Sequence, residues 1–168
     1  MALNQILLTP AIITEFYSNC LIETASVNEH PERKTKNEII WNFTGTNKNK
    51  ILVLTNYPDR KVFSHQQQSF LKRMFEACKI NFSDIALMNI SQNPEADYNK
   101  LYKFFESRVI ILFDIEPSSL GIPLSFPQFQ VQPFGNCLFL FTPSIEKLEE
   151  DSLQRSKLWI CLKRIFNI

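Results

Sequence analysis

Four short apolar runs divide the chain, each bounded by polar or turn-forming residues. They cover 51–55 (ILVLT), 84–90 (DIALMNI), 108–114 (RVIILFD) and 136–141 (NCLFLF). Continuous runs of large and β-branched apolar residues are typical of strands that are buried on both faces of a parallel sheet. We therefore predict four core strands. The first three should be parallel and adjacent, with 51–55 in the middle.

Helical spacing of apolar residues separates these runs. Ser64-x-x-Gln67 resembles a capping box, and the apolar face behind it predicts a helix over 65–79. Similar spacing predicts a helix over 97–106, and Asp151 opens a final helix after a short turn. The expected buried stripe of that last helix consists of Leu158, Trp159, Leu162, Ile165 and Phe166.

The N-terminal part of the chain has a different pattern. Residues 11–22 have the spacing of a short amphipathic helix, and the polar segment 24–37 that follows is expected to be a loop. The apolar run 38–43 could form an edge strand. The helix can either pack on the domain or dock to a partner through an apolar face made of Ile12, Ile13, Phe16 and Tyr17.

The order of these elements determines the expected fold class. Strands that alternate with helices build a mostly parallel sheet covered on both faces, and the proline-rich segment before the fourth strand excludes another long helix. We predict one α/β domain over 1–168, a three-layer α/β/α architecture with a four-stranded central sheet. Residues 1–37 would form the N-terminal helix and loop, and 38–168 the core.

Composition removes several classes of function. The net charge of +1 gives no overall attraction to nucleic acid or membrane, and three glycines are too few for a phosphate loop plus the usual turns. His30 and His65 are isolated, and the cysteines have no C-x-x-C spacing, so we expect no metal, iron–sulfur cluster or other cofactor. Without a signal peptide or membrane-spanning run, the expected location is the cytoplasm. The four cysteines are Cys20, Cys78, Cys137 and Cys161.

Ligands of such sheets bind at the carboxyl ends of the strands. Asn56, Asn89 and Thr142 fall there, together with the acidic residues Asp114 and Glu116, but no Ser–His–Asp arrangement does. Asp114 and Glu116 can be read as a carboxylate pair or as turn formers. Asn89 can be read as a group that recognises a nucleobase edge or as a tie between loops.

From 51 to 166, the chain resembles the uracil-DNA glycosylase-like superfamily. ILVLT-NYPD stands at the loop that carries the family's catalytic carboxylate, and Phe63 lies near the base-stacking position. SDIALMN ends in Asn89 at the base-reading position, and FTPS stands at the H-P-S motif. The resemblance implies the superfamily's fold and a vestigial base pocket made of Asn56, Phe63, Asn89 and Thr142.

Two departures from the family's motifs imply that catalysis is lost. Asn56 replaces the loop carboxylate and Thr142 replaces the histidine, and each of these groups contributes orders of magnitude to the rate in the family. The chain also resembles the psi subunits of bacterial DNA polymerase III, which have this fold without an active site and bind protein partners. EPSSLGIPLSFP and SKLWICLKRIF further resemble a family of uncharacterised proteins from Bacteroidetes-type bacteria, which implies no activity.

The expected function is therefore a non-catalytic protein-interaction module, a psi-like replication accessory protein whose partners would be clamp-loader subunits. The alternative is a pseudoenzyme that binds a nucleobase or single-stranded DNA through Phe63 and Asn89. A third hypothesis is an enzyme with relocated chemistry at Asp114 and Glu116. An open base pocket would favour the pseudoenzyme, whereas a filled pocket and an exposed apolar patch would favour the interaction module.

Overall fold

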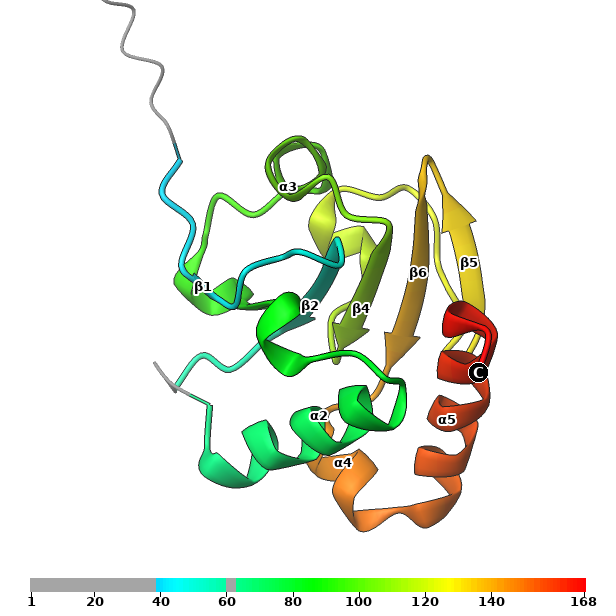
Figure 1. Ribbon diagram of the computed structural model, residues 1–168. Helices are drawn as coiled ribbons and strands as arrows, with labels where there is room; N and C mark the ends of the chain where they lie inside the picture. The colour runs from blue at the N-terminus through cyan, green and yellow to red at the C-terminus, as the bar shows by residue number, and fades with distance from the viewer. Residues whose placement is uncertain (1–38, 60–62) are drawn as a thin grey trace, which may run out of the picture. The chain divides into compact units, whose positions relative to one another are not determined.

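A six-stranded sheet organises the computed structural model, which describes residues 39–59 and 63–168. The described residues lie in one unit, Ile39–Ile168. The helix expected over 11–22, with Ile12, Ile13, Phe16 and Tyr17, lies outside them. The strand order is β1-β3-β2-β4-β6-β5 (Figure 1). The strands are β1 (Phe43–Thr44), β2 (Ile51–Thr55), β3 (Ala86–Asn89), β4 (Val109–Phe113), β5 (Val131–Phe134) and β6 (Cys137–Thr142).

The four predicted core strands are present and parallel. β2 lies between β3 and β4, with Val53 opposite Leu87 on one side and Ile111 on the other. β6 continues the parallel sheet beside β4. Every residue of β2, β3 and β4 is buried, as expected for strands covered on both faces. The predicted position of 51–55 between the other two strands is confirmed.

The sheet has six strands rather than four, because an antiparallel strand closes each edge. β1 is only two residues long, and it lies at the end of the apolar run 38–43. β5 forms a hairpin with β6 and contains Pro133. Pro133 made this segment unlike a core strand, yet proline is tolerated on an edge strand, where its missing N–H faces no neighbour.

Three helices cover one face of the sheet (Figure 1). They are α2 (His65–Ala77), α4 (Ile145–Glu150) and α5 (Ser152–Phe166). α2 begins with the predicted capping box, in which the Ser64 hydroxyl and the Gln67 side chain each accept from the other's backbone N–H. Asp151 caps α5 as predicted. α4 was not predicted; it fills the segment that was expected to be a short turn.

The other face of the sheet is covered by α3 (Tyr98–Phe105) and the 3₁₀ helix η3 (Pro117–Leu120). The short 3₁₀ helices η1 (Phe82–Asp84) and η2 (Ile90–Gln92) flank β3. Alternate residues of each strand point to opposite faces, so Leu52 and Leu54 contribute to this second apolar cluster while Val53 contributes to the first.

Candidate functional site

The carboxyl edge of the sheet holds the residues that the sequence marked as a base pocket. Asn56 follows β2, Asn89 ends β3 and Thr142 ends β6. Asn56 is exposed, and its side-chain oxygen accepts a hydrogen bond of 2.6 Å from the Ser91 hydroxyl. The structure thus brings the loops after β2 and β3 together, and their polar groups bind one another.

Asn89 is buried and ties these two loops. Its side-chain nitrogen donates to the Tyr57 carbonyl at 2.9 Å, and its side-chain oxygen accepts from the Tyr57 N–H at 3.0 Å. The same oxygen accepts from the Ser91 N–H at 3.3 Å. Both the donor and the acceptor of the amide are therefore engaged by the backbone. This geometry is that of a loop tie.

Thr142 is fully buried at the end of β6. Its hydroxyl donates to the carbonyl oxygen of Leu112 on the neighbouring strand, at 3.1 Å. A hydroxyl that is bonded within the sheet and shielded from solvent cannot present a donor to a bound base. Thr142 therefore joins β4 and β6 instead of facing a ligand.

Phe63 and Tyr57 form an aromatic pair beside the same edge. Their rings meet edge to face with centroids 5.9 Å apart, and Phe63 also packs on the apolar cluster under α2. The Tyr57 hydroxyl donates to the carboxylate of Glu146 at 3.1 Å, and the Gln67 amide donates to the same carboxylate. Glu146 thus links the loop after β2 to α2 and α4.

The sequence reasoning missed Glu146 and the role of Gln67 in this network. Glu146 lies on the unpredicted helix α4, so no sequence pattern placed it near Tyr57. In the sequence, Gln67 is recognisable only as the second residue of the capping box that begins at Ser64. Its side-chain oxygen accepts from the Ser64 N–H while its nitrogen reaches Glu146.

Asp114 and Glu116 have the geometry of turn residues. Asp114 is exposed with a left-handed backbone (φ 56°), and its N–H donates to the Thr142 carbonyl at 2.9 Å. Glu116 caps η3, where its backbone carbonyl accepts from the Ser119 hydroxyl at 2.7 Å. Both side chains are exposed, and the Glu116 carboxylate accepts from the Ser118 hydroxyl at 3.4 Å.

Neither metal ligation nor a reactive thiol is apparent in the described ranges. Residues 39–59 and 63–168 contain no group of three or more His, Cys, Asp or Glu side chains that could hold a metal ion. Cys78, Cys137 and Cys161 are buried and unpaired. Burial raises the pKa of the Cys78 thiol to about 11, and it also raises the pKa of Cys137 and of Cys161. All three are therefore protonated near neutral pH and pack as small apolar residues.

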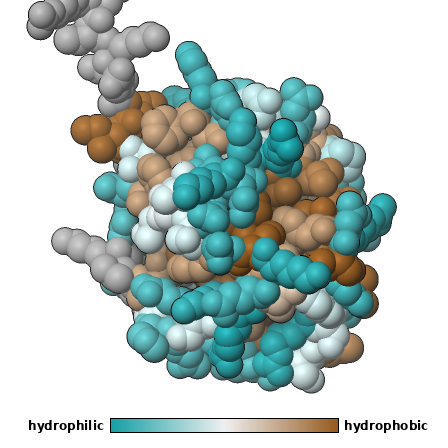
Figure 2. Space-filling view, viewed as in Figure 1, coloured by the Kyte–Doolittle hydropathy of each residue, from teal (hydrophilic) through white to brown (hydrophobic). Residues whose placement is uncertain are grey.

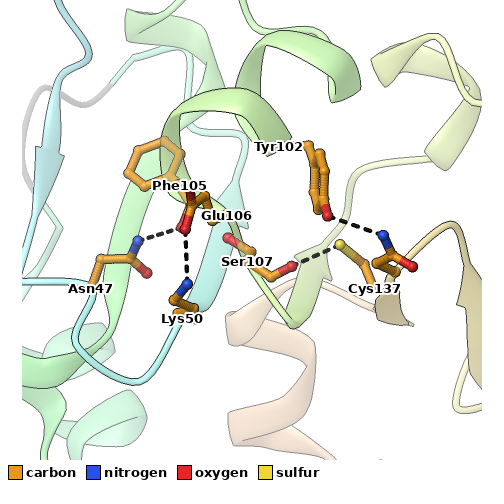
Figure 3. A network of polar contacts seen from close by, with 8 residues as sticks. Asn47, Lys50, Tyr102, Phe105, Glu106, Ser107 and Cys137 are labelled. Carbon is orange, nitrogen blue, oxygen red and sulfur yellow. Dashed lines mark hydrogen bonds and ion pairs between the residues drawn. The ribbon is translucent and has the colours of Figure 1, made fainter.

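A polar network at the opposite, amino-terminal edge of the sheet is structural (Figure 3). The Lys50 ammonium pairs with the Glu106 carboxylate at 2.8 Å, directly after α3. The Asn47 amide donates to the Phe105 carbonyl at 2.8 Å. These contacts fix the end of α3 to the loop before β2. Burial and the neighbouring Cys137 raise the pKa of Tyr98, on the first turn of α3, to about 12.

An open groove lies between α2 and α5, both of which contact α4. Its volume is about 600 Å³. Figure 2 shows apolar side chains gathered on this face of the molecule, with polar side chains around them. The groove is lined by Gln66, Phe70, Arg73, Met74, Glu149, Arg155, Leu158, Trp159 and Leu162.

Trp159 departs from the buried stripe predicted for the last helix. Leu158 and Leu162 are buried, whereas Trp159, Ile165 and Phe166 are half-buried and pack against the same core cluster. Trp159 also forms part of the groove wall. On α2, Phe70 and Met74 are also half-buried and lie one helical turn apart. The groove therefore exposes large apolar side chains from both helices.

Two arginines at the rim of the groove have no carboxylate partner. The Arg73 Nε donates to the Ser69 carbonyl of its own helix at 3.3 Å, and an Arg155 Nη1 donates to the carbonyls of Leu148 and Glu149. Within the described part of the chain, neither guanidinium lies within ion-pair distance of an acidic group. Both arginines are exposed at the edge of the apolar surface, and the Arg155 guanidinium also binds the last turn of α4.

No protein-family model matches the chain, and no curated protein matches it either. In the ranges that the structure describes, no helix has the length and apolar character needed to cross a membrane. The function must therefore be inferred from the two regions described above, the carboxyl edge and the groove.

Proposed function

We propose that this protein is a non-catalytic protein-interaction module of the cytoplasm, a replication accessory protein similar to the psi subunits of bacterial DNA polymerase III. One observation carries the proposal: the open apolar groove between α2 and α5, with Trp159 in its wall. Exposed apolar surface that is rimmed by polar groups is characteristic of protein-binding sites. Tryptophan and arginine are also the residues most enriched among interface hot spots.

The carboxyl edge supports the non-catalytic part of the proposal. Asn56 and Thr142 supply no general base or imidazole, and Thr142 is buried against Leu112. Asn89, the candidate base-reading residue, holds the backbone of Tyr57 instead. The parallel order of the four central strands, with helices on both faces, is compatible with a three-layer fold of the uracil-DNA glycosylase-like type.

The alternative function, binding of a nucleobase or single-stranded DNA, is favoured by one observation. Tyr57 and Phe63 place two aromatic rings beside the carboxyl edge, and aromatic rings stack on bases without sequence preference. In this alternative the protein would contact DNA directly. The engaged amide of Asn89 makes base-specific recognition the weaker candidate.

Binding of the purified full-length protein to purified clamp-loader subunits of the source organism tests the proposal. Size-exclusion chromatography with light scattering should show a stoichiometric complex. Uracil-containing single- and double-stranded oligonucleotides should release no uracil. If no clamp-loader subunit binds, the replication assignment is wrong. Uracil release that disappears in an Asn89→Ala variant would contradict the non-catalytic assignment.

A further inference from the structure

We infer that the groove between α2 and α5 binds an acidic amphipathic helix of a partner protein. This inference rests on the proposed protein-interaction function and names the chemistry of the partner. It is carried by three properties of the described residues: an apolar groove lining, arginines at the rim that have no carboxylate partner, and sheet edges that are poorly suited to an added strand.

The apolar lining of the groove matches an apolar helix face. Phe70 and Met74 come from α2, and Trp159 and Leu162 come from successive turns of α5. Rows of apolar side chains on two neighbouring helices receive the side chains at positions i, i+3, i+4 and i+7 of a third helix. The partner should therefore present a single apolar stripe.

The charges around the groove determine which charged residues the partner helix should carry beside its apolar stripe. The two bounding helices carry Lys72, Arg73 and one acid, Glu76, in α2, and four basic residues with no acid in α5. Lys72 already pairs with Glu76 at 3.8 Å. Arg73 and Arg155, at the rim, are left without a carboxylate among the described residues. Acidic side chains beside the apolar stripe would supply the missing carboxylates.

The acidic residues of α4, at one end of the groove, offset only part of this charge, because the groove lining contains Glu149 beside the two arginines. The Glu146 carboxylate accepts from Tyr57 and Gln67, and the Glu149 carboxylate accepts from Gln66 at 3.2 Å. These donors are neutral, so both carboxylates keep their negative charge. Arg73 and Arg155 against Glu149 leave the groove lining with a net positive charge, which favours an acidic ligand.

Strand addition is the less suitable mode of binding. An extended peptide needs a free strand edge with regularly spaced backbone groups. The outer strands of this sheet are β1, with two residues, and β5, with four residues including Pro133. Neither edge offers a continuous row of donors and acceptors, so the apolar groove is the surface that fits a peptide partner.

A display library of helical peptides, selected against the immobilised full-length protein, identifies the preferred ligand without assuming its sequence. Trp41 and Trp159 are the only tryptophans, and Trp41 is buried against Phe105. A Trp41→Phe variant therefore leaves Trp159 as the fluorescent reporter of the groove. We expect the selected peptides to have an apolar stripe flanked by Glu or Asp and to shift Trp159 emission. Their affinity should fall as the salt concentration rises.

Matched variants assign binding to the groove. Trp159→Ala should weaken binding of the selected peptides at least ~30-fold, as for an interface hot spot, whereas Ile160→Ala, on the neighbouring exposed position of α5, should change it less than about twofold. Arg73→Glu should weaken binding about tenfold. Arg164→Glu changes the charge equally on α5 but outside the groove, so it should have little effect.

Several results would overturn the inference. Selected peptides that are basic or that lack an apolar stripe would contradict the chemistry, and binding unaffected by Trp159→Ala would contradict the location. Self-association that Trp159→Ala abolishes would identify a second copy as the occupant. Strong protection of Trp159 from acrylamide quenching in the full chain without ligand would show that the groove is already filled.

Failure of this inference can be distinguished from failure of the proposed function. If clamp-loader subunits bind wild type and the Trp159→Ala and Arg73→Glu variants equally, the groove is not their site while the replication assignment stands. If acidic helices occupy the groove but no clamp-loader subunit binds, the partner chemistry stands and the replication assignment is wrong.

Discussion

The carboxyl edge of the sheet and the groove between α2 and α5 use their side chains in opposite ways. At the edge, polar groups that could contact a ligand are bonded to the protein itself, as Asn89 is to Tyr57 and Thr142 is to Leu112. At the groove, large side chains that could pack inside the protein are left partly exposed, as Trp159 is. These polar groups at the edge are therefore engaged within the fold, whereas the groove leaves apolar side chains available to a partner.

This difference separates a structural role from a binding role by simple physical criteria. A buried polar group whose partners all belong to the protein contributes to stability, and its loss leaves those partners unsatisfied. A half-exposed aromatic side chain in a groove contributes less to folding and retains apolar area for a partner. Stability and binding are therefore separate readouts for the two regions.

Among the variants at the carboxyl edge and the groove, Asn89→Ala should have the largest effect on stability. The substitution removes the amide that holds the Tyr57 N–H and carbonyl and leaves them unsatisfied, so the free energy of unfolding should fall by about 3 kcal/mol. Urea denaturation measures this change. Ser91→Ala, at an exposed position of the same network, is the control and should change it by less than about 0.5 kcal/mol. If Asn89→Ala lowered the free energy of unfolding as little as Ser91→Ala does, Asn89 would not be a structural tie between the loops.

Trp159→Ala should have an intermediate effect on stability because the side chain is only half-buried. We expect a loss of about 1–2 kcal/mol in the free energy of unfolding, less than for emptying a closed site. Phe75→Ala, on the buried side of α2, should lower it by about 3–5 kcal/mol. Thermal and urea unfolding compare the two. A loss for Trp159→Ala as large as that for Phe75→Ala would make Trp159 a core residue.

Thr142→Val should have a smaller effect at the carboxyl edge. The substitution keeps the shape of the side chain but removes the hydroxyl that donates to the Leu112 carbonyl. The free energy of unfolding should therefore fall by about 1 kcal/mol. Thr46→Val removes an exposed hydroxyl that donates to Ser83, and it should change stability by less than about 0.5 kcal/mol. Tighter binding of a nucleobase by Thr142→Val would show that the candidate base pocket at the carboxyl edge is open to a ligand.

The dependence of stability on pH should involve neither region. Burial raises the pKa of Cys78 from 9.0 to about 11, and the pKa of Tyr98 rises from 10.0 to about 12. In the folded protein these groups stay neutral at pH values at which they ionise in the unfolded chain. Their contribution to the free energy of unfolding is therefore complete below pH 9 and is lost as the pH rises through 11 to 12. Cys78→Ala should reduce the loss between pH 9 and 11, as measured by urea unfolding. An unchanged pH profile would show that the thiol does not contribute.

The sequence was sufficient for the central sheet because its signals are local. The continuous apolar runs predicted β2, β3, β4 and β6, and Ser64 and Asp151 marked the starts of α2 and α5. The proline-rich segment before β6 indicated only turns around a short extended piece. β5 lies in that segment, and its Pro133 is excluded from core strands but tolerated at an edge.

The groove could not be predicted in the same way. It depends on how α2 and α5 are spaced by α4, a six-residue helix whose IEKLEE sequence gives no long apolar period. The apolar spacing of α5 placed Trp159 on a buried stripe, because periodicity indicates a face but not how completely another element covers it. Asn89 was recognised as either a ligand group or a tie, and only the position of Tyr57 distinguishes the two.

The affinity of clamp-loader subunits for paired variants of the two regions tests the account most directly. Asn56→Ala changes an exposed residue of the carboxyl edge, and Trp159→Ala changes the wall of the groove. Isothermal titration with the full-length proteins should show at least ~30-fold weaker binding for Trp159→Ala and less than about twofold change for Asn56→Ala. The reverse order, with Asn56→Ala losing binding and Trp159→Ala retaining it, would place the functional site at the carboxyl edge and contradict the account.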